Sequence, residues 1–86
     1  DLAWFGVSER IERRLLDLAA RLGRPTDGGT LIPVRLTQDD LASMVGATRE
    51  TANRALGRLL ARGVIERQSR ARYVVRSPLR LVPDAD

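Results

Sequence analysis

The chain has 86 residues, enough for one small domain with a modest core, and 43% of them are hydrophobic but only 3% aromatic. It has no cysteine and no histidine, which excludes disulfides, zinc sites built on thiol or imidazole ligands, and the commonest nucleophile–base pairs of enzymes. No apolar run approaches a membrane span of about 18 residues, and the first residues do not resemble a signal peptide. We therefore expect a cytoplasmic protein that is not an enzyme and that has no membrane partner and no metal site.

The positive charge is concentrated in one half of the chain. The formal net charge is +4, and all 15 basic residues are arginine. Residues 49–80 contain nine arginines and two glutamates, whereas residues 1–48 contain six arginines and seven acids. Such clustering favours a polyanionic partner, nucleic acid above all. The alternative is a solvated surface in a protein from an arginine-favouring genome, which explains the missing lysine but explains the clustering less well.

The first predicted element is a helix over residues 9–22. Ser8 is a suitable N-cap, apolar residues recur at helical spacing, and Gly23 is a typical helix end. Turn residues fill positions 24–29. Residues 30–36 are β-branched and apolar, but Pro33 limits them to an edge strand or a short extended piece.

Two further helices, joined by a tight turn, are predicted next. Thr37 caps the first of them, with Asp40 completing an approximate capping box, and Gly46 ends it. Thr48 then caps a helix that runs over residues 49–62. Helix, glycine turn and helix together predict a helix-turn-helix.

The last predicted element is an antiparallel hairpin. Residues 64–67 and 72–75 are rich in strand-forming side chains, and four polar or small residues separate them. We therefore predict a mainly α fold with a small β component, a winged helix-turn-helix in which the hairpin is the wing. The domain spans residues 8–78, and residues 79–86 form a C-terminal tail.

The helix over residues 49–62 has an apolar face and a polar face. The apolar side chains require a core; they are Ala52, Ala55, Leu56, Leu59 and Leu60. The polar side chains are of types that recognise base edges, arginine suiting guanine, glutamate cytosine and asparagine adenine. The predicted base-reading residues are Arg49, Glu50, Asn53 and Arg54. Alternatively, Glu50 and Arg54 pair with each other on a solvated face, since they are four positions apart.

Eight residues are predicted to contact phosphates of the DNA backbone. Four lie near helix starts, where hydroxyl, amide and backbone N–H groups hold anions; they are Thr37, Gln38, Thr48 and Thr51. Four are arginines in the basic half; they are Arg58, Arg62, Arg70 and Arg72. The alternatives are that the two capping threonines only cap their helices and that the arginines are ordinary surface charges.

The residues just described resemble a known family. Residues 36–54, LTQDDLASMVGATRETANR, resemble the helix-turn-helix signature of the Crp/Fnr (cyclic-AMP receptor protein) family of bacterial transcription regulators. The LLARGVI of residues 59–65 continues the resemblance into the wing, and residues 2–11 resemble the family's interdomain hinge and the helix after it. The resemblance implies a C-terminal winged-helix domain that binds double-stranded DNA with its recognition helix, residues 49–62, in the major groove.

The resemblance also implies particular partners. Arg49, Glu50 and Arg54 match the positions that read a TGTGA-like half-site, whereas Asn53 replaces a common glycine. A two-fold palindrome would be bound by a homodimer of the full-length protein, as activator or repressor, and the loop over 24–30 lies where the family can contact RNA polymerase. Residues 1–7 would be the remnant of a dimer helix and hinge. The fragment itself is expected to bind no cofactor, because cyclic AMP would bind only in a missing N-terminal domain.

A second class of function stays open at this point. Winged helices also serve as protein–protein interaction modules without sequence-specific DNA binding, and a fold alone does not fix a function. A gel shift with random and TGTGA-type duplexes would distinguish the two classes.

Overall fold

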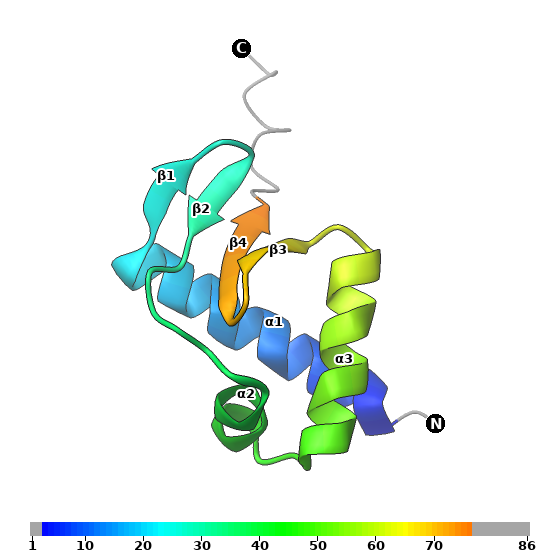
Figure 1. Ribbon diagram of the computed structural model, residues 1–86. Coiled ribbons are helices and arrows are strands. Elements are labelled where there is room, and N and C mark those ends of the chain that lie inside the picture. Colours follow the sequence, from blue (N-terminus) through cyan, green and yellow to red (C-terminus); the bar gives the residue numbers. More distant parts are fainter. Residues whose placement is uncertain (1–2, 77–86) are drawn as a thin grey trace.

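The computed structural model describes residues 3–76 and consists of three helices and a small antiparallel sheet (Figure 1). The elements are, in order, α1 (Ala3–Leu22), β1 (Arg24–Thr26), β2 (Gly29–Leu31), α2 (Gln38–Val45), α3 (Arg49–Ala61), β3 (Ile65–Ser69) and β4 (Arg72–Arg76). This order confirms the mainly α winged helix-turn-helix. The predicted tail over 79–86 lies outside the described residues. No helix within residues 3–76 is long and apolar enough to cross a membrane.

Helix α1 begins at Ala3, so the predicted start at Glu9 is wrong. Ser8 does not cap the helix but lies inside it, only 2% exposed. The reason is that residues 3–8 contain no proline. Val7 also extends the buried apolar face by one turn on the N-terminal side of Ile11. Burial against the core therefore outweighs the capping preference of a serine in this position.

The first half of the sheet differs from the prediction. Strand β2 ends at Leu31 and lies between β1 and β4, so of the two predicted possibilities for residues 30–36 the edge strand is wrong, and only a short piece up to Leu31 is strand. Strand β1 occupies part of the predicted turn and pairs with β2 around a turn in which Gly28 has φ of 82°. The backbone N–H of Ile32 still donates to the carbonyl of Tyr73 (3.0 Å). The N–H of Leu36 likewise donates to the carbonyl of Ala71 (2.7 Å), so backbone contact with the wing continues past Pro33.

The wing is the β3–β4 hairpin, and it is confirmed with slightly longer strands than predicted. The predicted turn over 68–71 tightens to Arg70 and Ala71, and Ala71 adopts a left-handed φ of 65°. The register shifts between Arg67 and Ser69, which indicates a local irregularity in β3. Strand β4 lies between β2 and β3, so the wing is continuous with the rest of the sheet.

The helix-turn-helix has the caps that the sequence predicts. The Thr37 hydroxyl accepts from the backbone N–H of Asp40 (3.1 Å), and the Asp40 carboxylate accepts from the N–H of Thr37 (2.8 Å). Gly46 ends α2 with a left-handed φ of 69°, and Thr48 caps α3. Helix α3 ends at Ala61, with Arg62 as its cap, one residue earlier than predicted.

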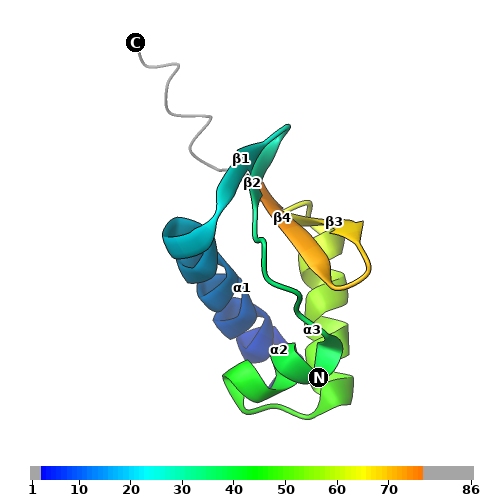
Figure 2. The same ribbon diagram turned by 60° about the vertical axis from the view of Figure 1, so that its left-hand side comes forward.

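The core lies between the helices and the inner face of the sheet, with α2 at one end of the helical layer and the sheet at the other (Figure 2). The apolar face of α3 is buried as predicted, except that Leu60 is only partly covered. Each fully buried leucine or isoleucine contributes about 1.5–3 kcal/mol of transfer free energy; those of α1 and α3 include Ile11, Leu15, Leu56 and Leu59. This burial fixes the rotation of α3 and turns its opposite face outward.

Candidate nucleic-acid-binding surface

The exposed face of α3 carries all four predicted base-reading residues. Arg49 and Glu50 begin the helix, Asn53 and Arg54 follow one turn later, and all four are exposed. Glu50 and Arg54 do approach each other, with 3.7 Å between carboxylate and guanidinium, but their side chains are 81% and 63% exposed. An ion pair so open to water contributes at most about 1 kcal/mol, so it does not keep either side chain from a ligand.

A hollow of about 440 Å³ lies between the start of α2, the start of α3 and the wing. Four guanidinium groups and a single carboxylate, that of Asp39, are among its lining side chains. The arginines are Arg35, Arg49, Arg67 and Arg70. We call this the basic hollow. An excess of cations around a concavity of this size suits a phosphate group.

A second hollow, of about 400 Å³, runs along the other side of α3, between that helix and β3. Three of the base-reading residues line it, Glu50, Asn53 and Arg54, together with Arg67. Gly57 also lines it, and a Cβ built there would meet nothing within 4 Å. Arg67, on strand β3 of the wing, lines both hollows, so it lies near Arg49 on one side and near Glu50, Asn53 and Arg54 on the other.

Arg67 is held in place by Tyr73 of the neighbouring strand. Its Nη1 atom donates to the Tyr73 hydroxyl over 3.3 Å, and its Cζ atom lies 5.5 Å from the centre of the ring. Tyr73 is itself only 1% exposed. A core residue therefore fixes a surface cation, in a geometry that allows a cation–π contact.

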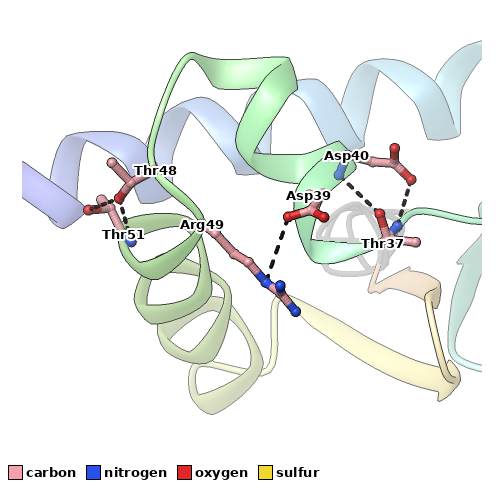
Figure 3. A network of polar contacts seen from close by, with 6 residues as sticks. All are labelled: Thr37, Asp39, Asp40, Thr48, Arg49 and Thr51. Carbon is pink, nitrogen blue, oxygen red and sulfur yellow. Dashed lines mark hydrogen bonds and ion pairs between the residues drawn. The ribbon is translucent and has the colours of Figure 1, made fainter.

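The N-termini of α2 and α3 each carry capping hydroxyl groups, on either side of the contact between Arg49 and Asp39 (Figure 3). The Thr48 hydroxyl accepts from the N–H of Thr51 (3.1 Å) and donates to the Thr51 hydroxyl (3.0 Å). Thr37 is occupied in the capping box, and its hydrogen bonds lower the pKa of the Asp40 carboxyl, the one from its backbone N–H most of all. Gln38 and Thr37 both line the basic hollow. Both threonines therefore cap their helices, and the start of α2 lies at the basic hollow.

The structure does not bring all the predicted arginines together. Arg70 lines the basic hollow at the turn of the wing. Arg62 lies instead at the far end of α3, where it pairs with Glu12 of α1 (3.6 Å). Arg58 is half-buried on α3, and Arg72 is half-buried on β4, with a buried Nε atom that has no hydrogen-bond partner.

Two arginines of the basic hollow, Arg35 and Arg67, are missing from the predicted phosphate contacts. Arg35 precedes the cap of α2 and has no periodic pattern around it. Arg67 belongs to the arginine-rich half of the sequence, but only the pairing of β3 with β4 places it over Tyr73 and beside α3. Its position two residues after the buried Ile65 in the strand pattern was the only signal available in the sequence.

Comparison with known proteins agrees with this architecture. The family model described as "Crp-like helix-turn-helix domain" matches residues 9–82. A "CRP-like cAMP-activated global transcriptional regulator" of Mycobacterium tuberculosis is 38% identical over 71 residues, which cover 83% of this chain and 32% of that protein. An "Anaerobic regulatory protein" of Bacillus subtilis is 38% identical over 65 residues, covering 76% of this chain and 27% of that protein. The chain thus spans about a third of the length of the curated relatives it matches.

Solved structures show the same fold. The CO-dependent transcription factor CooA from Carboxydothermus hydrogenoformans superposes with a TM-score of 0.79 at 21% identity, over 99% of this chain and 39% of that one. The reduced CO-sensing protein from R. rubrum gives a TM-score of 0.71 at 28% identity, over 96% of this chain and 37% of that one. The arrangement of helices, sheet and wing is therefore shared with both.

Proposed function

Because this chain belongs to the family of Crp-like helix-turn-helix domains, we propose that it binds double-stranded DNA as part of a bacterial transcription regulator. The observation that carries the proposal is the outward face of α3. Four polar side chains of base-reading types stand at the start of a helix whose opposite face is buried in the core. A helix fixed in this way can enter the major groove with its N-terminal residues against the bases.

The proposed half-site is of the TGTGA type. Arginine presents two parallel donors to O6 and N7 of guanine, and glutamate accepts from N4 of cytosine. We therefore assign guanine contacts to Arg49 and Arg54 and a cytosine contact to Glu50. Asn53 lines the same hollow as Glu50 and Arg54, and its amide suits adenine at a neighbouring position.

The DNA backbone would lie against the basic hollow. We propose that Arg35, Arg67 and Arg70 contact phosphates there, in addition to the N–H and hydroxyl groups at the starts of α2 and α3. Arg62 is assigned a different role, because its ion pair with Glu12 ties the end of α3 to α1. Two such domains on a two-fold palindrome, with half-sites about one helical turn apart, would read one half-site each.

Selection of bound duplexes from a random pool tests this function. The expected result is enrichment of TGTGA-type half-sites. Equal recovery of all sequences would contradict the proposal and favour a winged-helix module that binds other proteins.

The role of Arg49 has a test of its own. We expect Arg49→Ala to cost roughly 1–3 kcal/mol of binding free energy on the selected duplex and to relax the preference at one base position. Arg70→Ala is the matched control, because a lost phosphate contact should weaken selected and random duplexes alike. Fluorescence anisotropy on both duplexes measures the difference. An Arg49→Ala variant that weakened both duplexes equally would show that Arg49 does not read a base.

A further inference from the structure

We propose that Asp39 is a positioning residue for base recognition, which holds the Arg49 guanidinium in the orientation that reads guanine. This inference rests on the proposed function and adds a specificity-determining residue to it. Asp39 lies in the first turn of α2, and its Oδ1 atom is 3.7 Å from Nε of Arg49 at the start of α3 (Figure 3). The ion pair therefore crosses between the two helices of the helix-turn-helix.

The atom that Asp39 approaches is the informative detail. A guanidinium group has five N–H donors, one on Nε and two on each terminal nitrogen. Because the carboxylate lies nearest to Nε (Figure 3), the outer N–H donors of the two terminal nitrogens are left for another partner. Guanine is read by two parallel donors at O6 and N7. Asp39 thus restrains the guanidinium group at Nε and leaves its two terminal nitrogens for guanine.

Asp39 is not part of the capping box of its own helix. The neighbouring Asp40 completes the capping box, and the side chains of Arg49 and Asp39 are 65% and 75% exposed. An exposed ion pair of this kind adds little to folding stability. It can still matter for recognition, because a long arginine side chain loses much rotamer freedom when it binds, and a side chain that is already restrained loses less.

The charge of Asp39 has a separate effect, on the affinity for DNA of any sequence. Within residues 3–76 it is the only acidic residue that lines the basic hollow, where the phosphates of any bound duplex would approach. A carboxylate there opposes every DNA sequence equally, whereas the restraint on Arg49 helps only duplexes that offer guanine. The shared repulsion lowers every affinity without changing the differences between sequences, so the preference for guanine comes from the restraint on Arg49 alone.

The test compares Asp39→Asn with the wild type on three duplexes. These are the selected half-site, the same half-site with its Arg49-contacted guanine replaced, and a random sequence. We expect the preference for guanine to fall roughly twofold to fivefold, and the affinity for random duplex to rise by a similar factor. Asp27→Asn is the matched control, since it removes an exposed acid from the β1–β2 turn with the same charge change. It should leave the preference for guanine unchanged.

A double-mutant comparison separates positioning from a general charge effect. In an Arg49→Ala background, Asp39→Asn should cause no further loss of preference at that base. A second readout uses the free protein: the NMR signal of the Arg49 Nε–H group should shift in Asp39→Asn and stay in place in Asp27→Asn. Melting temperature confirms that each variant is folded.

The outcomes distinguish the two proposals. If the wild type prefers guanine and Asp39→Asn keeps the full preference, the positioning role is overturned while DNA reading stands. A preference that fell equally with or without Arg49 would also overturn it, because Asp39 would then act elsewhere. If the wild type itself shows no preference for guanine on any duplex, the proposed function fails, and this inference fails with it.

Discussion

The two neighbouring aspartates at the start of α2 have different tasks. Asp40 accepts a hydrogen bond from the backbone N–H of Thr37 and closes the capping box of its own helix. Asp39, one position earlier, points instead toward Arg49 of the next helix (Figure 3). Successive residues of a helix lie on different faces. Asp40 therefore contacts the cap of its own helix, whereas Asp39 contacts an arginine on the exposed face of α3.

The capping role of Asp40 predicts a pH dependence of stability. Hydrogen bonds from Thr37 lower the pKa of the Asp40 carboxyl in the folded chain below its value in the unfolded chain, which is about 4. The carboxylate therefore stabilises the fold above that unfolded value, and the stabilisation is lost as pH falls through the lower, folded value. We expect the difference in unfolding free energy between wild type and Asp40→Ala to be largest at neutral pH and to shrink below about pH 4. Urea unfolding from pH 7 to pH 2 measures this difference, and a constant value would contradict it.

Arg67 shows which part of the site could not be predicted from sequence. Capping threonines and base-reading side chains follow local rules, because a helix start and a helix face are set by residues within four positions of each other. The place of Arg67 depends on Tyr73 across the hairpin and on α3 beside it. Those contacts exist only after the strands pair and the helix packs, so no local pattern specifies them.

At the scale of elements, the helices of the helix-turn-helix were predictable and the first hairpin was not. Helices α2 and α3 carry their own start and stop signals at Thr37, Gly46 and Thr48. Strands β1 and β2 have three residues each; β1 pairs only with β2, and β2 pairs with β4. Short strands of this kind gain their stability from tertiary context rather than from propensity, which is why the β-branched run at 30–36 gave the wrong boundaries.

Two glycines allow a prediction about these elements. A Cβ at Gly29 would lie 2.1 Å from the carbonyl oxygen of Val75, so an alanine there must push β2 away from β4. We expect Gly29→Ala to destabilise the fold by about 1–3 kcal/mol. Gly57→Ala should stabilise it by about 0.5–1 kcal/mol, because its position in α3 is open and alanine favours a helix. Urea unfolding of both variants checks the pair, and the same sign for both would refute this assignment.

At the scale of the whole molecule, arginines that are distant in the sequence gather around the basic hollow. The basic hollow gathers arginines from the segment before α2, from α3 and from the wing. Other arginines engage partners within the fold: Arg21 pairs with Asp17 along α1, and Arg62 pairs with Glu12. The net charge of the chain therefore understates how positive the surface around the basic hollow is.

This clustering of arginines predicts how DNA binding depends on salt. Each phosphate that an arginine neutralises releases counterions, so the slope of log K against log salt is about −0.9 per contact. If Arg35, Arg67 and Arg70 all contact phosphates, their combined replacement by alanine should make the slope shallower by about three. Replacing Arg13, an exposed arginine of α1 outside both hollows, should leave the slope unchanged. Anisotropy titrations from low to moderate salt measure both slopes. A triple variant as salt-dependent as the wild type would place the DNA backbone on another face of the molecule, whereas a selective loss would locate it against the wing and the starts of α2 and α3.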